Sequence, residues 1–379
     1  MDQPRTSGPP TGRSETEELH LSATPTSSAP EGIHADRVTE WFTEHVEGVV
    51  APLRFELIAG GHSNLTYAVT DRAGSRWVLR RPPLGHVLAT AHDMGREHRI
   101  ISALQGTAVP VPVVEGLCQD DGVNDAPFYV MRFVDGRVVR SPADAAALDP
   151  AARRRSGESL VDVLAAIHQV DVEQVGLSEL GRHDGYVARQ LRRWYGQFEQ
   201  SVEQEPGLLG LPAIHDVHAH LSANIPEQQG VSIVHGDYRL DNCMLDDTGE
   251  VVAVLDWEIC TLGDPLADLG LLCVYWTDPD GVAVLPQAAP TTLDGFMRSS
   301  ELVERYAARS DLDLSGLDYY VTFGFWKLTC IIAGVYARYA GGAMGDVPAS
   351  QVDGFKVVLD QLAQATLDSV SPGTGGGPP

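Results

Sequence analysis

The strongest constraint on the fold of this chain lies in residues 235–258, where two polar clusters flank a short hairpin pattern. The first cluster reads His-Gly-Asp-Tyr-Arg-Leu-Asp-Asn and the second reads Asp-Trp-Glu. Between them, an apolar run at 243–245 and a β-branched run at 251–255 enclose Asp-Asp-Thr-Gly, a typical turn sequence. A hairpin returns its ends to each other, so we expect Asn242 and Asp256 to lie side by side.

This arrangement predicts a phosphoryl-transfer site. Asn242 and Asp256 would supply the hard oxygen ligands that magnesium prefers, with waters and substrate phosphates completing its coordination. Asp237 precedes Asn242 by five residues, and its carboxylate could accept the proton of a hydroxyl nucleophile or orient it for in-line attack. One such residue alone would be ordinary turn chemistry. Their joint spacing is instead that of protein kinases, with a catalytic Asp, an Asn and a further metal-binding Asp.

The same residues resemble the aminoglycoside phosphotransferase and choline kinase-like family, whose fold is similar to that of eukaryotic protein kinases. Gly236 stands where protein kinases have Arg, and Asp-Trp-Glu at 256–258 replaces Asp-Phe-Gly. Both departures are usual in that family. Residues 254–270 are especially similar to the subgroup associated with acyl-CoA dehydrogenases. The likeness extends over residues 55–339.

The resemblance implies an α+β, protein-kinase-like fold of two lobes, a small antiparallel β-sheet lobe and a larger, mainly helical lobe. It also implies an enzyme that uses ATP and magnesium to phosphorylate a small hydroxylated substrate. In that enzyme Asp237 would be the base, and Asn242 and Asp256 would bind the metal. We expect Asp264 and Asp268 to cap and hold the helix that follows them.

Composition and periodicity divide the chain into four parts. Residues 1–30 and 371–379 lack an apolar period and are expected to be disordered tails. The resemblance implies that residues 31–134 form the small nucleotide-binding lobe and that residues 135–370 form the helical lobe for catalysis and acceptor binding. Strands are expected at 55–59, 65–70, 76–80, 113–117 and 128–133. Helices are expected at 36–46, 92–104, 151–168, 185–204, 213–222, 302–309, 317–340 and 351–370.

The small lobe contains the residues that we expect to bind the nucleotide. The loop Gly60, Gly61, His62, Ser63 and Asn64 joins two strands and could fold over phosphates, because glycine exposes backbone amide donors. Taken alone, two glycines between strands are equally well an ordinary turn.

Three further features complete this prediction. Arg80 occupies the position of the phosphate-contacting Lys of kinases, and a guanidinium can grip phosphate through two hydrogen bonds. The fold analogy makes Glu97 its ion-pair partner. The backbone near Met131 and Phe133, at the connection between the lobes, could bind the adenine edge.

The formal net charge of -25 argues against nucleic acid or an anionic membrane as a partner. Five widely spaced cysteines without a CxxC pair suit buried thiols in a reducing cytoplasm. The N-terminus lacks an apolar signal core, and the longest apolar stretch, residues 321–333, is interrupted by Lys327. We therefore expect a cytoplasmic protein and a buried helix at 321–333.

The acceptor is not encoded by these motifs. Arg189, Arg192 and Arg193 form the most basic stretch of an acidic chain, either as a solvated helix face or as the wall of a pocket for an anionic acceptor. A hydroxy acid or hydroxyacyl-CoA is one candidate, and an aminoglycoside or another amino alcohol is the alternative. A nucleotide-binding pseudokinase with a regulatory role is a third reading. The sequence leaves the oligomeric state open.

Overall fold

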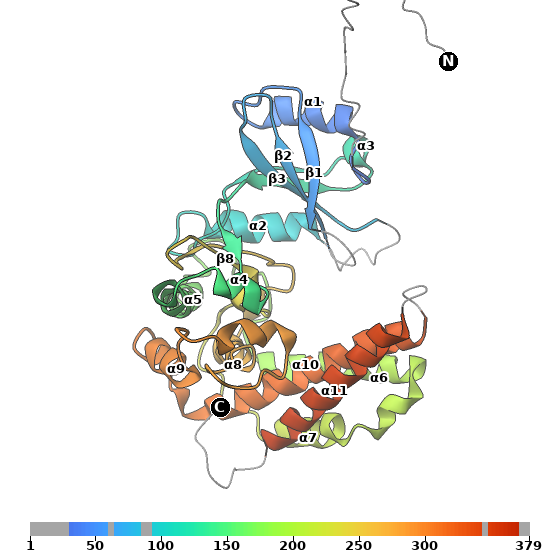
Figure 1. Cartoon of the computed structure of the whole chain (residues 1–379), viewed down its shortest axis with the longest axis vertical. Coiled ribbons are helices and arrows are strands. Elements are labelled where there is room, and N and C mark those ends of the chain that lie inside the picture. Colours follow the sequence, from blue (N-terminus) through green and yellow to red (C-terminus); the bar gives the residue numbers. More distant parts are fainter. Residues whose placement is uncertain (1–29, 60–63, 85–92, 343–347, 371–379) are drawn as a thin grey trace, which may run out of the picture.

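The computed structural model describes residues 30–59, 64–84, 93–342 and 348–370. Within them the chain forms a β-sheet lobe above a mainly helical lobe (Figure 1). The predicted α+β class and the division into two lobes are confirmed. The tails predicted at 1–30 and 371–379 lie outside the described residues, apart from Pro30 at their edge.

The small lobe is built on one five-stranded antiparallel sheet with the order β1-β2-β3-β5-β4. The register pairs Tyr67 with both Leu57 and Leu79, so β2 is the middle of a three-stranded meander. The strands are β1 (Arg54–Ala59), β2 (Leu65–Thr70), β3 (Arg76–Arg81), β4 (Val114–Cys118) and β5 (Phe128–Arg132). The helices are α1 (Ala35–His45), α2 (Met94–Leu104) and α3 (Asp121–Asn124).

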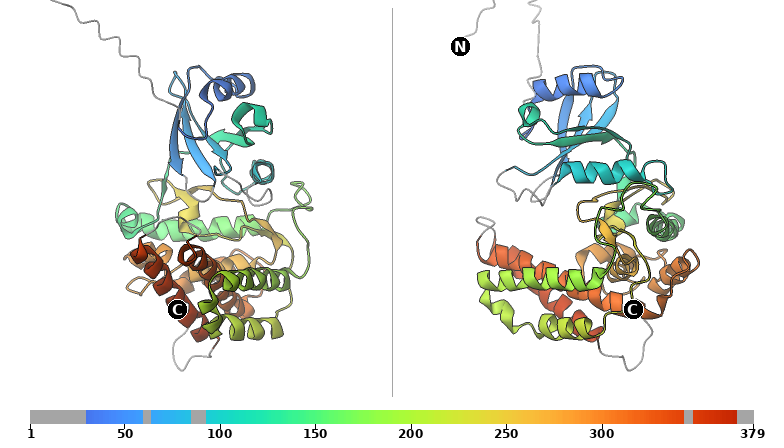
Figure 2. Two further views of the ribbon diagram at one scale, coloured as in Figure 1. Left: turned by 90° about the vertical axis from the view of Figure 1, so that its right-hand side faces the viewer. Right: turned by 180° about the vertical axis from the view of Figure 1, so that it is seen from behind.

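The residues of this sheet belong to two different cores, because strand side chains alternate between its faces. Leu79 packs in the core that α1 closes, where Trp41 meets Phe128 at a ring-centroid distance of 4.9 Å. Its neighbour Val78 belongs instead to the large core that α2 shares with the helical lobe. In Figures 1 and 2, α2 accordingly lies between the sheet and the large lobe.

The large lobe is organised around α10, which packs against α6, α7, α8 and α11. By length and composition α10 could cross a membrane, but 67% of its apolar window is buried inside the protein. The buried helix expected at 321–333 is confirmed. The helices are α4 (Pro142–Ala146), α5 (Pro150–His168), α6 (Tyr186–Gln204), α7 (Pro212–Ala223), α8 (Leu266–Val274), α9 (Ser299–Ala307), α10 (Leu317–Ala340) and α11 (Ala349–Asp368).

Two small sheets lie where the lobes meet. One has the order β6-β8-β9 and contains the predicted hairpin, and the other pairs β7 with β10. The sequence predictions did not include strands β6, β7 and β10, which have too few residues to show a period. The strands are β6 (Arg137–Val138), β7 (Ser232–Val234), β8 (Cys243–Leu245), β9 (Val251–Val254) and β10 (Thr261–Gly263).

The largest error in a helix boundary is at the start of α9, and other expected boundaries, such as those of α2 and α11, differ by two residues or fewer. The helix expected at 302–309 is α9, which begins three residues earlier, at Ser299. The apolar period starts only at Leu302, but the Glu301 carboxylate accepts a hydrogen bond from the N–H of Arg298 at 2.7 Å. This contact satisfies an amide at the helix start and extends the helix toward its N-terminus.

Candidate active site

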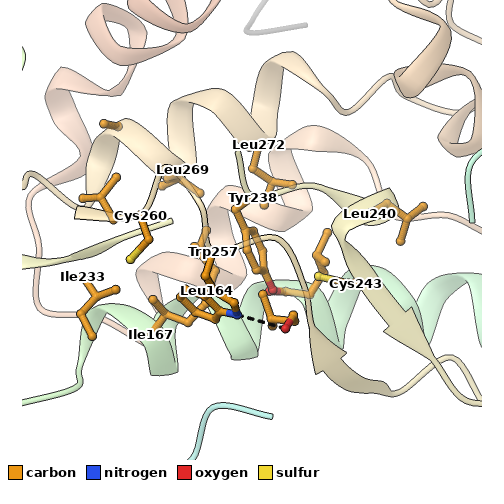
Figure 3. Close-up of a cluster of buried hydrophobic side chains, with 14 of the residues drawn as sticks. Leu164, Ile167, Ile233, Tyr238, Leu240, Cys243, Trp257, Cys260, Leu269 and Leu272 are labelled. Atoms are coloured by element: carbon orange, nitrogen blue, oxygen red, sulfur yellow. Dashed lines mark hydrogen bonds between the residues drawn. The ribbon is translucent and has the colours of Figure 1, made fainter. Parts of the chain in front are cut away.

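The two polar clusters are positioned by aromatic residues beside them. Tyr238 follows Asp237 and Trp257 follows Asp256, and both aromatic side chains are fully buried. Figure 3 shows them inside one apolar cluster formed by side chains of the large lobe. Their polar groups are also used, because the Tyr238 hydroxyl donates to the carbonyl of Leu160 at 2.8 Å. Burial of these rings therefore fixes the backbone that carries each carboxylate.

The hairpin brings the predicted polar residues together. The N–H of Leu255 donates to the carbonyl of Asn242 at 2.8 Å, which closes the open end of the strand pair. The Asn242 side chain donates through Nδ2 to Asp237, at 2.8 Å to its carbonyl and 3.0 Å to its Oδ2. This leaves Asn242 Oδ1 as an acceptor for a cation. Asp256 adopts a left-handed backbone with φ 63°, and it lines the same pocket as Asn242.

The loop before Asp237 is held by Asp268, whose role was predicted wrongly. Asp264 does contact the start of α8, accepting from the N–H of Leu266 at 3.1 Å. Asp268 instead lies inside α8, and its carboxylate accepts from the backbone N–H groups of His235 at 2.6 Å and Gly236 at 2.9 Å. Asp268 lies in the first turn of α8 and is buried, and its carboxylate faces this loop rather than the free amides of its own helix start.

The environment of Asp268 keeps it charged. Burial alone would raise the pKa of this carboxyl, but His168 and the loop amides hold the pKa below its ordinary value. The His168 ring lies 3.5 Å from the Asp268 carboxylate through Nε2 and 2.6 Å from the Tyr306 hydroxyl through Nδ1. A buried polar chain thus runs from Tyr306 through His168 and Asp268 to residues 235–237. We call this loop, which carries the predicted base, the catalytic loop.

The carbonyl side of the loop has its own anchor. Lys327 of α10 donates through Nζ to the carbonyl of Gly236 at 2.6 Å. Burial lowers the pKa of this ammonium, an effect that Asp237 and Asp268 oppose. Gly236 itself adopts φ 85°, and a Cβ there would lie 3.2 Å from the Ile259 side chain. Glycine is therefore required at this position, where protein kinases have Arg.

Arg239 is a site residue that the sequence reasoning missed. Its Nε lies 3.2 Å from Asp237 Oδ2, and its Nη1 lies 2.7 Å from Asp241 Oδ2. Its guanidinium stacks over the Tyr275 ring at 5.0 Å. These contacts place a cation beside the predicted base. The available signal was its position, two residues after Asp237 in the polar cluster.

The small lobe contributes Arg80 and Glu97 as predicted partners. Arg80 Nε lies 3.3 Å from Glu97 Oε2, and Arg80 Nη2 donates to Asp256 Oδ1 at 2.7 Å. The contact with Asp256 was not expected. It joins β3 of the small lobe to the end of the hairpin. A single guanidinium therefore contacts Glu97 within the small lobe and Asp256 across the lobe boundary.

Burial dominates the electrostatics of this group. It raises the pKa of Glu97, with Arg80 opposing the shift. Burial alone would lower the pKa of Arg80, but Glu97 and Asp256 raise it above its ordinary value. Burial and the neighbouring Asp256 raise the pKa of Glu258 to about 7. Three carboxyl groups are therefore crowded around Arg80, and the raised pKa values of Glu97 and Glu258 show that burial and mutual repulsion disfavour their charged forms.

A pocket of about 390 Å³ extends from Arg80 and Asp256 to the connection between the lobes. Its apolar wall is lined by Ile58, Val78, Ile101, Met131, Phe133 and Met244, and its polar end by Asn64, Arg80, Asn242 and Asp256. Such a pocket, apolar at one end and charged at the other, suits a nucleotide. The predicted residues Gly60, Gly61, His62 and Ser63 lie outside the described residues.

The backbone of the connection is already partly used. The N–H of Arg132 donates to the carbonyl of Val113 at 2.7 Å, and the N–H of Phe133 donates to that of Arg76 at 3.2 Å. Phe133 and Met131 therefore contribute apolar surface to the pocket. A base-recognising N–H must come from another residue, and Val134 lines the pocket next to them.

The donor set fits magnesium bound mainly through phosphates. Among the described residues no group of three or more His, Cys, Asp or Glu forms a ready-made cage. Magnesium usually takes one or two protein ligands and completes its octahedron with waters and phosphates. Asn242 Oδ1 and the Asp256 carboxylate, both at the polar end of the pocket, are suitable oxygens.

The basic stretch of α6 divides into three different environments. Arg189 is half-buried and donates to the carbonyl of Arg182 at 2.9 Å, and Arg192 is exposed. Arg193 is exposed as well, but it lies over the Trp194 ring at 4.9 Å, and the Lys327 ammonium lies over the same ring at 5.5 Å. Arg193 is therefore the arginine of this stretch that reaches the surroundings of the catalytic loop.

Curated proteins share this chain's sequence over most of its length. Acyl-CoA dehydrogenase family member 10 of Mus musculus is 32% identical over 323 residues, which cover 84% of this chain and 29% of the relative. Acyl-CoA dehydrogenase family member 11 of Homo sapiens is 30% identical over 310 residues, covering 80% and 39%. The chain thus spans less than half the length of these relatives.

Solved structures share the fold. A Ralstonia eutropha protein, provisionally named an aminoglycoside phosphotransferase, is 32% identical with a TM-score of 0.71, covering 88% of this chain and 98% of that protein. APH(2")-IIa, solved as a ternary complex with streptomycin and ATP, is 15% identical with a TM-score of 0.54 and covers 79% and 90%. The second likeness concerns the fold alone.

A family model described as the phosphotransferase enzyme family matches residues 54–301. The match contains the sheet of the small lobe, the hairpin and α8, and so includes every described residue of the predicted site. The kinase-like fold expected from the sequence is confirmed by the solved structures. This chain therefore belongs to the phosphotransferase enzyme family of the aminoglycoside phosphotransferase type.

Proposed function

We propose that this chain transfers the γ-phosphoryl group of ATP to a hydroxyl group of a small substrate, with magnesium as the cofactor. The observation that supports this proposal is the meeting of Asp237, Asn242 and Asp256 at one end of the hairpin. They meet beside a pocket of about 390 Å³ whose charged end carries Arg80. The pieces needed for phosphoryl transfer are a base, metal ligands and a phosphate contact.

Each residue then has a defined task. Asn242 and Asp256 would hold magnesium, which would neutralise the phosphate charge when bound. Asp237 accepts the proton of the attacking hydroxyl or orients it. Arg239, whose Nε lies 3.2 Å from Asp237 Oδ2, holds that carboxylate in place. Arg80 exchanges part of its contact with Asp256 for the phosphates, helped by the loop that ends at Asn64.

The acceptor that we favour is anionic, namely a hydroxy acid or a hydroxyacyl-CoA. Arg193 supports this choice, because it is close enough to Lys327 to affect its pKa and lies on the same Trp194 ring. The relatives' names refer to acyl-CoA dehydrogenases, which is consistent with an acyl-CoA-related acceptor. The alternative acceptor is an aminoglycoside or another amino alcohol, which would be attracted by the acidic residues of the chain.

The test is a screen of hydroxylated acceptors with purified protein, ATP and magnesium, read by the mass gain of one phosphoryl group. Replacement of Asp237 by Asn keeps the size of the side chain and removes its charge, so transfer should be lost. If Asp237→Asn phosphorylated the acceptor as fast as the wild type, the assigned base would be wrong. Nucleotide binding without turnover on any acceptor would instead favour a pseudokinase.

The acceptor class has its own test. Neutralising Arg193 as Arg193→Gln should raise the KM of an anionic acceptor and leave the KM of ATP unchanged. Arg192→Gln is the matched control, since Arg192 is exposed on the same helix. Equal KM values for the two variants would argue against an anionic acceptor held by Arg193.

A further inference from the structure

Helix α2 is linked to the chain segment after the hairpin through two consecutive residues. Arg96 contacts the segment directly, and Glu97 is linked to it through Arg80. Arg96 donates through Nη1 to the carbonyl of Glu258 at 3.1 Å, and through Nη2 to the carbonyl of Cys260. Glu97 is the ion-pair partner of Arg80, which donates to Asp256. Both ends of residues 256–260 are therefore connected to the first turn of one helix.

The geometry of α2 explains how neighbouring residues can do this. Consecutive side chains project about 100° apart around a helix, so Arg96 and Glu97 leave the helix in different directions. The turn that carries them is fixed by Asp93, whose side chain accepts from the N–H of Arg96 at 2.9 Å. Glu97 then points to the buried Arg80, and Arg96 passes over the segment's backbone.

The segment itself is tightly folded. After Asp256, with φ 63°, Trp257 is buried and its carbonyl accepts the N–H of Cys260 at 3.2 Å. Ile259 packs against Gly236, next to the proposed base. Through this turn, the position of two carbonyl groups is linked to the direction of the Asp256 side chain and to the catalytic loop.

We infer that Arg96 is a positioning residue for Asp256, and that it sets the orientation in which this carboxylate meets magnesium and the nucleotide phosphates. The inference rests on the proposed function. It goes beyond that function because, among the described residues of the site, the Arg96 guanidinium donates to backbone carbonyls, and a cation cannot itself ligate magnesium. Residues that orient metal ligands from outside typically change metal affinity ten- to hundredfold when they are replaced.

The chain offers a matched control in the same helix. Arg99 also reaches from α2 to the large lobe, and it donates through Nη2 to the carbonyl of Gly176 at 2.8 Å. Gly176 lies in the connection between α5 and α6, and this contact touches no residue of the site. Arg99→Gln therefore removes an α2 contact with the large lobe without affecting residues 256–260.

The experiment is titration calorimetry of the full chain with ADP, once with EDTA and once with saturating magnesium. The ratio of the two affinities measures how much magnesium strengthens nucleotide binding, and it needs no acceptor. We expect Arg96→Gln to lower this ratio about tenfold with the EDTA affinity unchanged. Arg96→Lys, which can reach one carbonyl, should recover part of the loss. Arg99→Gln should match the wild type.

The outcomes separate the inference from the proposed function. If magnesium leaves the ADP affinity of the wild type unchanged, the metal assignment fails and the inference fails with it. If the wild type responds to magnesium and Arg96→Gln responds equally, only the inference is overturned. An equal loss of affinity with and without magnesium also overturns it, because that pattern indicates general loosening of the lobes. If Arg96→Gln fails to fold, as judged by circular dichroism, the magnesium dependence of ADP affinity is compared between Arg96→Lys and the wild type instead.

Discussion

The catalytic loop and the nucleotide side of the pocket face each other across the lobe boundary, but the protein holds them differently. On the loop, the N–H groups of His235 and Gly236 are bound by Asp268, and the carbonyl of Gly236 by Lys327. On the nucleotide side, Asn64 Oδ1, Arg80 Nε and both carboxylate oxygens of Glu97 are buried without a hydrogen bond of good geometry. Arg80 and Glu97 are an ion pair at 3.3 Å.

The difference shows which side of the site is already fixed by contacts within the folded protein. The loop that carries Asp237 is fixed by partners from α8 and α10, so its geometry is part of the folded state. The charged groups on β3 and α2 have spare bonding capacity, which phosphates could satisfy. Substitution of Asp268, the carboxylate that anchors the loop, should therefore lower stability, and substitutions on the nucleotide side should lower function with little effect on stability.

The largest effect is expected for Asp268→Ala. It leaves two buried amides and His168 without their acceptor, so the free energy of unfolding should fall by about 3–5 kcal/mol. Chemical denaturation measures this loss. Asp264→Ala is the matched control, because Asp264 is equally buried but accepts from Tyr320 and Leu266. Both variants should be destabilised, and only Asp268→Ala should also lower the kcat of the folded protein.

A double substitution tests the nucleotide side of the pocket. Arg80→Met combined with Glu97→Gln replaces both partners of the buried pair. Asp256 also loses its contact with Arg80, but its side chain is 34% exposed and can be solvated by water. The free energy of unfolding should then stay within about 1 kcal/mol of the wild type. The kcat/KM for ATP should fall about a hundredfold, since a charge-assisted phosphate contact is lost. A loss of stability as large as that of Asp268→Ala would erase the contrast between the regions.

Lys327→Met sharpens the comparison within the loop. Burial lowers the pKa of the Lys327 ammonium in the folded state, so burying this group costs stability at neutral pH, which lies below its unfolded pKa. Stability should therefore be unchanged or higher in the variant, measured at pH 7. The kcat should nevertheless fall about tenfold, because the carbonyl of Gly236 loses its donor. A variant with unchanged kcat would show that this anchor does not orient Asp237.

The smallest effect is expected away from both regions. Asp162 of the large lobe accepts from Arg305 at 2.7 and 2.8 Å and from Arg309 at 3.0 Å. Burial would raise the pKa of this carboxyl, but the two arginines hold it below its ordinary value. Asp162→Asn should cost about 1 kcal/mol or less because the group is partly exposed.

The pH dependence of that variant has a definite sign. A carboxyl whose pKa is lower in the folded state stabilises the protein above its unfolded pKa, and the contribution is lost as the pH falls through the folded pKa. The difference between Asp162→Asn and the wild type should therefore be constant near neutral pH and shrink in acid. A difference that grew in acid would contradict the assignment. Denaturation series across the acid range provide the measurement.

Much of the site could be predicted because its parts are local. Asn242 and Asp256 are joined by one hairpin, and turn residues with flanking β-branched residues indicate such a hairpin directly. The hairpin prediction needed only the spacing of side chains along a short segment. Arg80 and Glu97 were predicted from the analogy with kinases, which assigns roles to their positions on a strand and a helix.

The anchors could not be predicted for a physical reason. Asp268, Lys327 and Arg96 contact backbone N–H or carbonyl groups that are 32 to 164 residues away in the sequence. Every residue has a similar backbone, so the partner's identity leaves no trace in its side chain. Asp268 was read as a cap of its own helix because that is what a local pattern indicates.

The division of the sheet between two cores bears on how the protein unfolds. Val78, Tyr129 and Met131 of the small lobe and Ile100 of α2 belong to the same apolar core as the helical lobe. If residues 30–134 were separated from the rest, that face would be exposed to water and would promote association. The two lobes should accordingly lose their structure in one cooperative transition, and the boundary between them is a boundary of function rather than of folding.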